Sequence, residues 1–411
     1  MSLREQTGYR SETVRRANLS VILREVHLDP TLSRTDLVAR TGLTRSGIRA
    51  VIGELVAAGL VHEERGEPQG TPGRPSPYVR PNPDGAVVLA LEIAVDSLAV
   101  ATVGLGGHVH DLVRIDRPRT RFSLDETLDD LLELARLVRA RRPASDALVG
   151  VGVAVVGVVR RSDGLVRLAP NVGWIDAPLG QTLTDALDLD VPVSVANEAD
   201  LGALAEHRRG AAVGVDHLLF ISGEVGVGGG LIVDGRPLVG LAGYGGEVGH
   251  LPVNPAGAVC RCGSVGCWET EVGERRLLLL AGHPPNGGRG EVDAVLREAA
   301  GGAPEALNAI DNVGRWLGIG LAGLVNILNP QVIVLGGQFG RMLPFVSGSI
   351  RSELDRLALD ASSELVDIRP AMLGVDAPLL GAAELAFERL LDDPLAWAAA
   401  AAGNTEAAGT A

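Results

Sequence analysis

Three cysteines and one histidine lie close together in the second half of the chain. Cys260, Cys262 and Cys267 are the only cysteines, and His250 stands ten residues before the first of them. Three thiolates and one imidazole are a suitable ligand set for a closed tetrahedral zinc site. Because four protein ligands leave no position for a metal-bound water, we expect one structural zinc ion per chain. The alternative is three buried thiols beside an unrelated histidine.

The residues around these ligands resemble the signature of the ROK family. The run Glu247-Val-Gly-His250 is followed by the pattern C-x-C-G-x-x-G-C-x-E, which ends at Glu269. The ROK family contains sugar kinases and sugar-responsive transcriptional regulators. The resemblance therefore leaves two functional classes, which other parts of the chain must separate.

The resemblance implies a sugar site made of carboxylates, amides and one imidazole. Its expected residues are Asn171, Asn197, Glu198, Glu247, His250 and Glu269. A carboxylate can accept hydrogen bonds from two neighbouring hydroxyls, which suits a sugar ligand. His250 would have two functions, with one ring nitrogen on zinc and the other on a hydroxyl. The alternative is that these polar side chains only stabilise loops.

The segments that match the phosphate loops and the catalytic base of ROK kinases lack the residues that these elements need. The first phosphate loop of ROK kinases reads Asp-x-Gly-Gly-Thr, whereas this chain has Glu92-Ile-Ala-Val-Asp96. In the second loop Val225 replaces a threonine, and Glu224 adds a negative charge. Glu198 stands where the kinases have a catalytic aspartate, and its extra methylene would misplace a base. We expect no catalytic residue and no kinase activity.

The first 80 residues carry the pattern of a helix-turn-helix. Apolar residues recur at helical spacing from Thr13 to Val26, and Asp29-Pro30 ends the run. Ser33 and Asp36 form a capping-box pattern that opens a second helix, and Thr44 is placed to cap a third. The third helix has an expected apolar stripe of Ile48, Val51, Ile52, Leu55 and Val56.

The N-terminal segment also has side chains suited to contacts with DNA. The expected DNA contacts on the third helix are Thr44, Arg45, Ser46 and Arg49. Arg74, in Gly73-Arg74-Pro75, is suited to a minor groove. A hairpin between Val61 and Tyr78-Val79 would form a wing. Residues 13–80 resemble the winged helix-turn-helix of ROK regulators, which the kinases generally lack. The alternatives are a solvated polar face and a simple linker.

The charge distribution agrees with a DNA-binding module on an acidic body. The chain of 411 residues has a net charge of −14, yet its first 81 residues contain 12 arginines and nine acidic side chains. No apolar run reaches the length of a membrane span, and the N-terminus lacks the apolar stretch of a signal peptide. We therefore expect a soluble cytoplasmic protein.

Apolar strand-like runs alternate with helices after residue 84. Strands are predicted at 87–93, 98–103, 148–155, 217–221, 231–233 and 332–335, and a helix is predicted at 124–141. This order indicates an α/β fold. The family resemblance implies a two-lobed, actin-like sugar-kinase fold. The expected boundaries are 1–82 for the winged helix-turn-helix, 83–394 for the ROK domain and 395–411 for a disordered tail. Within the ROK domain, lobe 1 would comprise 83–198 and 376–394, and lobe 2 would comprise 199–375.

We interpret the chain as a sugar-responsive, DNA-binding regulator of carbohydrate-metabolism genes, and as a repressor. Its expected partners are operator DNA and a monosaccharide, and it should be a homodimer or a dimer of dimers. The proline-rich segment 68–83 should be stiff enough to carry lobe movements to the wings. The alternatives are an active sugar kinase fused to a DNA-binding domain and a regulator controlled by a protein partner.

Overall fold

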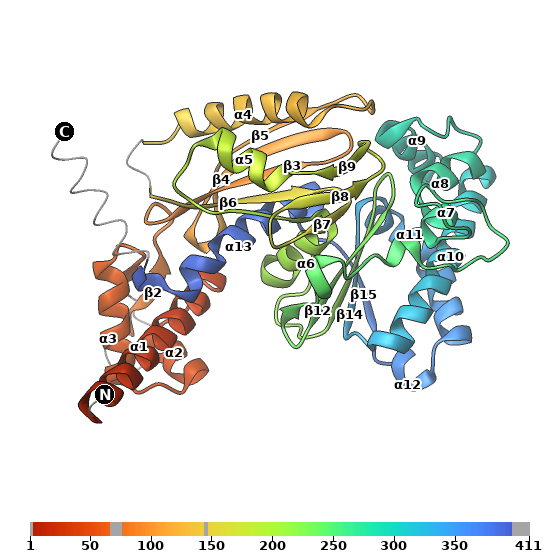
Figure 1. Cartoon of the computed structure of the whole chain (residues 1–411). Helices are drawn as coiled ribbons and strands as arrows, with labels where there is room; N and C mark the ends of the chain where they lie inside the picture. The colour runs from red at the N-terminus through yellow and green to blue at the C-terminus, as the bar shows by residue number, and fades with distance from the viewer. Residues whose placement is uncertain (1–2, 66–75, 144–146, 397–411) are drawn as a thin grey trace.

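Three helices and a β-hairpin form the N-terminal module at one end of the molecule (Figure 1). This computed structural model describes residues 3–65, 76–143 and 147–396, with side chains from residue 12 onward. The elements of the module are α1 (Leu3–Leu28), α2 (Arg34–Thr41), α3 (Arg45–Ala57), β1 (Val61–Glu64) and β2 (Tyr78–Pro81). The antiparallel pair β1–β2 confirms the predicted hairpin. The fold class is therefore the predicted winged helix-turn-helix followed by a two-lobed α/β domain.

Local capping explains where α2 and α3 begin. The Ser33 hydroxyl accepts a hydrogen bond from the Asp36 amide, while the Asp36 carboxylate accepts one from the Ser33 amide. The Thr44 hydroxyl accepts the Gly47 amide at 3.1 Å and caps α3. Four residues of the predicted stripe on α3 are buried, but the prediction for Val56 is wrong. Val56 is 42% exposed because it lies about 100° around the helix from Leu55.

Lobe 1 is built on a five-stranded sheet in the order β10-β6-β3-β4-β5. Its strands are β3 (Val87–Ile93), β4 (Ser97–Gly104), β5 (His108–Asp116), β6 (Leu148–Val155) and β10 (Val193–Asn197). A small sheet of β7 (Val158–Arg160), β8 (Leu165–Ala169) and β9 (Trp174–Ala177) lies beside it. The predicted strands at 87–93 and 148–155 are confirmed.

Alternate residues of the lobe 1 strands face two different helical layers. Leu89 and Leu91 pack in one cluster with α4 (Leu124–Ala140) and α5 (Leu179–Leu187). Val88 and Ala90 pack in another cluster with α13 (Ala377–Asp392). Figure 1 shows α4 and α13 on opposite sides of this sheet. Both faces are therefore covered, which explains why the central strands β3 and β6 are largely apolar.

Lobe 2 repeats the same sheet plan. Its order is β13-β12-β11-β14-β15. The strands are β11 (Leu218–Gly223), β12 (Val227–Val233), β13 (Arg236–Pro237), β14 (Val332–Gly336) and β15 (Asp367–Pro370). The helices that follow lobe 1 are α6 (Glu198–Arg209), α7 (Trp268–Val272), α8 (Glu274–Leu280), α9 (Gly288–Ala300), α10 (Pro304–Leu328), α11 (Gly337–Leu357) and α12 (Asp360–Ser363).

The repeated plan brings two equivalent hairpin turns to the cleft between the lobes. In each sheet the first three strands form an antiparallel meander, and two parallel strands follow beside the first. The turn of residues 94–96 joins β3 to β4, and the turn of residues 224–226 joins β11 to β12. Residues of both turns line one cleft. These turns contain the two segments for which the sequence resemblance predicts a correspondence with the phosphate loops of the kinases.

The N-terminal module and lobe 1 share one continuous apolar core. Leu19, Leu23 and Val26 of α1 belong to the same buried cluster as Phe387 and Leu390 of α13. The module is thus held by packing, independently of the proline-rich segment, of which residues 68–75 lie outside the described residues. Among the described residues, no helix is long and apolar enough to cross a membrane.

The predicted start of the disordered tail needs a small correction. Residues 394–396 form a helical turn, and Leu395 packs against the core that α13 shares with the module. Leu395 is ordered because its apolar side chain gains burial at this surface. The remainder of the predicted tail, 397–411, lies outside the described residues.

Candidate metal centre and sugar cleft

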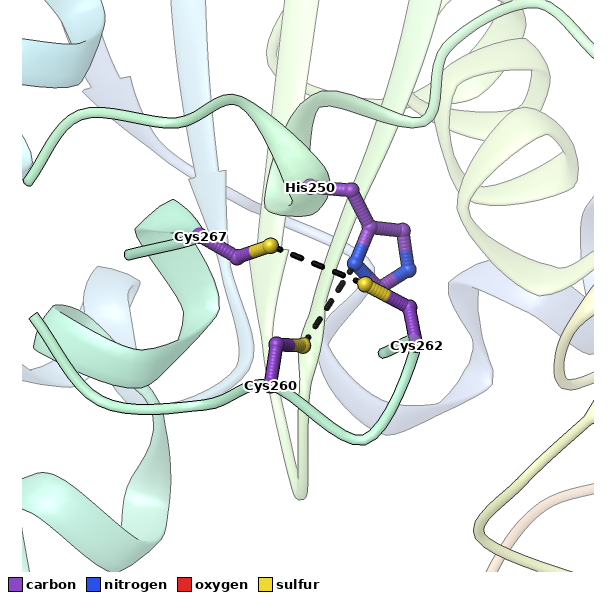
Figure 2. A group of neighbouring side chains, drawn as sticks. All are labelled: His250, Cys260, Cys262 and Cys267. Carbon is purple, nitrogen blue, oxygen red and sulfur yellow. Dashed lines mark hydrogen bonds between the residues drawn. The ribbon is translucent and has the colours of Figure 1, made fainter. Parts of the chain in front are cut away.

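The four predicted metal ligands converge on one point (Figure 2). The ligand atoms of His250, Cys260, Cys262 and Cys267 all lie within 4.8 Å of one another. The Cys260 Sγ lies 3.8 Å from the His250 Nδ1, and the Cys262 Sγ lies 3.7 Å from the Cys267 Sγ. Sulfurs bound tetrahedrally to one zinc ion at about 2.3 Å would be about 3.8 Å apart. The donor set and its spacing therefore fit a four-coordinate metal ion.

Tight backbone contacts place the cysteine loop over lobe 2. Gly266 has φ +70°, and a Cβ there would collide with the Asn254 carbonyl oxygen. The Trp268 amide donates to the Leu251 carbonyl at 2.8 Å, which joins the end of the loop to the segment after His250. The Trp268 ring is fully buried against Gly320 of α10. This anchoring lets ligands from two segments share one site.

His250 faces the metal centre with one nitrogen and the cleft with the other. Its Nδ1 is directed at Cys260, and its Nε2 lies 4.0 Å from the Glu247 carboxylate. Glu247 and His250 both line the cleft between the lobes. A metal ion on Nδ1 would fix the orientation of the ring and leave Nε2 available to a ligand.

All six predicted sugar residues line that same cleft. They are Asn171, Asn197, Glu198, Glu247, His250 and Glu269. Glu269 is held by the β11–β12 turn, because its carboxylate accepts the Val227 amide at 3.3 Å. Asn171 accepts a hydrogen bond from Arg261, a residue between two of the cysteines that no sequence motif singled out. The structure thus gathers side chains from both lobes around one space.

Asn197 has a more structural position than the sequence predicts. Its side-chain oxygen accepts the Ala199 amide at 2.7 Å and the Asp200 amide at 3.3 Å, which makes it the N-cap of α6. Its side-chain nitrogen donates to the Gly157 carbonyl at 2.8 Å. Asn197 therefore ties the start of α6 to lobe 1 and has only one amide hydrogen left for a ligand.

The cleft is crowded with negative charge. Burial raises the pKa of Glu198 to about 8, and repulsion from Glu224 and Glu92 adds to this effect. Burial also raises the pKa of Glu224 and of Glu92 above the usual range of a glutamate. A carboxyl with a pKa of about 8 is mostly protonated at neutral pH and can then donate a hydrogen bond.

Three arginines that no sequence motif singled out form ion pairs with acidic residues that line the cleft. Arg289 of α9 lies 3.3 Å from the Asp96 carboxylate and 3.5 Å from that of Glu224. Arg119 pairs with Asp96 at 2.9 Å and with Glu274 of α8 at 2.5 Å. Arg114 pairs with Glu92 at 2.8 Å. No local sequence signal marks these partners, because they come from distant segments.

The predicted DNA-contacting residues on α3 form an exposed group. Thr44, Arg45, Ser46 and Arg49 are all exposed at the start of this helix. Among the described residues, neither Arg45 nor Arg49 has a hydrogen-bond or ion-pair partner. Most neighbouring arginines do, as in the ion pair of Arg15 with Glu54 at 2.7 Å. Arg74 lies outside the described residues.

Known transcriptional regulators match nearly the whole chain. The xylose repressor of Bacillus spizizenii is 29% identical over 386 residues, which cover 92% of this chain and 97% of the repressor. A solved ROK family transcriptional regulator, a homologue of the E. coli MLC protein, matches 92% of this chain with a TM-score of 0.76 and 27% identity. It is covered over 97% of its own length.

Sugar kinases match a smaller share of the chain. A glucokinase from Streptomyces griseus, solved with glucose and AMPPNP, matches 73% of this chain and is itself covered over 98%, with 26% identity and a TM-score of 0.62. The profile of the ROK family matches residues 88–389, which begin after the N-terminal module. This match covers more than half of the chain, and the chain therefore belongs to the ROK family.

Proposed function

We propose that this protein is a sugar-responsive transcriptional repressor that binds operator DNA and does not phosphorylate its sugar. The observation that carries the proposal is the pairing of a cleft lined by carboxylates and amides with a module that exposes Arg45 and Arg49, which have no ion-pair partner in the part of the chain that the structure describes. The similarity to a xylose repressor along 92% of the chain supports it. The effector is a monosaccharide, and its contacts come from the six cleft residues.

The N-terminal module would read DNA with the start of α3. Arginine can pair bidentately with guanine, and exposed hydroxyls at a helix start can bind phosphate. A homodimer would place two such helices on the half-sites of a pseudo-palindromic operator. The β1–β2 hairpin and Arg74 would contact the adjacent minor groove.

The metal is zinc in this proposal, and its function is structural. His250, Cys260, Cys262 and Cys267 would hold it. The ion would clamp the loop that carries Glu247, His250 and Glu269, so that the sugar meets a prearranged set of acceptors.

The absence of phosphoryl transfer follows from the two hairpin turns. A kinase needs backbone amides and cations around the phosphates of ATP. Here the turns carry Asp96 and Glu224, and the nearby Arg289 already contacts both. The active-kinase alternative has one favourable observation, which is that Gly336-Gly337 resembles the adenosine-side loop of the kinases. With ATP, magnesium and the best sugar ligand, we expect no turnover above background.

Two binding measurements test the repressor proposal. A thermal-shift screen with glucose, xylose and N-acetylglucosamine should identify a stabilising sugar. An operator, selected from a random pool of duplex DNA, should bind the protein and respond to that sugar. We expect Arg45→Ala to weaken operator binding at least about tenfold and to leave sugar affinity unchanged. Glu247→Ala should keep operator binding and lose the sugar response.

The control variant is Arg15→Ala, because Arg15 is on α1 and is paired with Glu54 away from the start of α3. It should keep most of the operator affinity. A normal sugar response in Glu247→Ala would show that the effector binds elsewhere. Failure of every sugar to bind, with intact operator binding, would favour control by a protein partner.

A further inference from the structure

The two hairpin turns of the cleft carry matched negative charges. Asp96 comes from the β3–β4 turn of lobe 1, and Glu224 comes from the equivalent β11–β12 turn of lobe 2. The Arg289 guanidinium lies between them, at 3.3 Å from Asp96 and 3.5 Å from Glu224. Arg289 is therefore already neutralised, as Arg119 is by Asp96 and Glu274.

The lining of the cleft has more carboxylates than cations. Its acidic lining residues are Glu92, Asp96, Glu198, Glu224, Glu247 and Glu269, and its arginines are Arg261 and Arg289. Burial raises the pKa of Glu198 to about 8, and repulsion from the neighbouring carboxylates Glu224 and Glu92 adds to this effect. A phosphate group would bring almost two further negative charges to this acidic lining.

We propose that Asp96 and Glu224 are specificity residues that restrict the effector to unphosphorylated sugars. This inference rests on the proposed sugar site and extends it to the chemical class of the ligand. Neutral hydroxyls can donate to the carboxylates of the cleft, whereas a phosphate dianion can only accept. A sugar phosphate should bind about 100-fold more weakly than its parent sugar, the scale of a like-charge contact.

Calorimetric titration of matched pairs tests this specificity. The probes are glucose with glucose 6-phosphate, xylose with xylose 5-phosphate, and N-acetylglucosamine with its 6-phosphate. The tightest ligand should be a free sugar. Asp96→Asn combined with Glu224→Gln should release Arg289 and improve binding of the phosphate at least about tenfold. Asp293→Asn, which removes an α9 carboxylate paired with Arg341 outside the cleft, should change neither affinity.

A sugar phosphate that binds wild type more tightly than every free sugar would overturn the inference. If the double variant does not fold, the wild-type comparison of each pair still decides it. Binding of neither member of any pair would remove the sugar site itself, and this inference with it. These outcomes separate failure of the specificity proposal from failure of the proposed function.

A second, independent observation concerns how the cleft reaches the N-terminal module. Helix α6 begins at Glu198 in the cleft and ends at Arg209 beside α1. Its residues from Ala199 to Glu206 are all buried. It packs closely on α13, since a Cβ at Gly381 would collide with the Leu201 carbonyl. A buried helix of 12 residues is a rigid connection between its two ends.

A buried polar joint connects the end of α6 to α1. The Arg209 guanidinium donates to the Gly106 carbonyl at 2.8 Å and lies 3.4 Å from the His27 carbonyl oxygen. Arg209 also pairs with Glu384 of α13 at 2.5 Å. The Gly106 amide donates to the Nδ1 of His27 at 3.0 Å, and the Nε2 of His27 lies 3.1 Å from the Glu384 carboxylate and 2.7 Å from the Arg209 guanidinium.

The joint also involves an ion pair between α6 and α13. Arg208 lies 3.1 Å from the Glu384 carboxylate. Because these groups are buried and in direct contact with one another, a shift of α6 cannot leave α1 in place without breaking several of their contacts. Helix α1 in turn packs on α3, within the core that the module shares with lobe 1.

We infer that α6 transmits the state of the sugar cleft to the DNA-binding helices, and that Arg209 is the positioning residue at its end. This inference rests on the proposed function. Arg209→Gln should keep operator affinity without sugar and sugar affinity without DNA within about threefold. It should abolish most of the change in operator affinity that the sugar causes in wild type.

The matched control is Arg16→Gln, which removes an exposed ion pair between α1 and Asp393 at 3.1 Å and touches no part of α6. It should respond to the sugar as wild type does. Arg209→Lys retains the charge and should restore part of the response. A full sugar response in Arg209→Gln would overturn the inference. If that variant does not fold, Glu384→Gln gives the same test, because Glu384 holds the same joint. A wild type without any sugar response would contradict the proposed function instead.

Discussion

The carboxyl of Glu198 lies in the cleft, in surroundings that disfavour its charged form. Burial and the neighbouring carboxylates raise its pKa from 4.5 to about 8. The folded state therefore favours the protonated form. The stability linked to this group is fully present below pH 4.5 and is lost as the pH rises through 8. Protonated Glu198 would also donate a hydrogen bond in the cleft.

The melting temperatures of Glu198→Gln and wild type should diverge as the pH rises. The amide mimics the protonated acid, so both proteins should melt at similar temperatures at about pH 5. At about pH 8.5 the variant should melt a few degrees higher, which differential scanning calorimetry would detect. Glu305→Gln, at an exposed position on α10, should show no such pH dependence. Equal melting of Glu198→Gln and wild type at the higher pH would show that the carboxylate is not destabilising.

Cys262 tests the link between the metal and the sugar. Cys262→Ser removes one of four ligands, and we expect elemental analysis to fall from one zinc per chain to near zero. Sugar affinity should fall at least about tenfold, because the loop that orients His250 loses its clamp. Ser264→Ala, in the same loop but outside the ligand set, should retain both. Full sugar binding by metal-free protein would break this link.

At the scale of elements, close helix packing depends on glycine. Gly381 lies where α13 contacts α6, and a Cβ there would collide with the Leu201 carbonyl. Gly381→Ala should therefore lower the free energy of unfolding by about 1–3 kcal/mol, the usual effect of overpacking. Gly348 lies in α11, and a methyl group added there would have no other atom within 4 Å. Gly348→Ala should thus be neutral or stabilising by up to about 1 kcal/mol. Chemical denaturation would compare the two.

At the scale of the whole molecule, the proposed coupling between sugar binding and operator binding depends on the contact between the N-terminal module and lobe 1. The expected route through a stiff proline-rich segment is not required, because α1 packs directly on α13. We predict that the sugar weakens operator binding. By linkage, operator DNA must then lower sugar affinity by the same factor. Titrating sugar with and without operator measures both effects, and unequal factors would show that the binding scheme is incomplete.

The sequence alone was sufficient to predict the features that depend on residues close together in the chain. The candidate metal ligands lie within 18 residues, so their spacing could be recognised before any fold was known. The caps at Ser33 and Thr44 and the largely apolar runs of β3 and β6 are also short-range patterns. The acidic residues in the two phosphate-loop segments could be read as a loss of kinase chemistry, although not as partners of one arginine.

Only the tertiary structure decided which distant charges meet. His27 and Glu384 are 357 positions apart, and Arg289 reaches Asp96 from another lobe. Such pairs depend on how helices pack across the cleft, and no periodic pattern in a single segment encodes them. Long-range packing also explains why the prediction for Asn197 was incomplete. Its motif suggested a sugar contact, but its side chain forms most of its hydrogen bonds with backbone groups of Gly157 and Ala199. Local spacing thus determined the candidate chemistry, and long-range packing determined how the sites are connected.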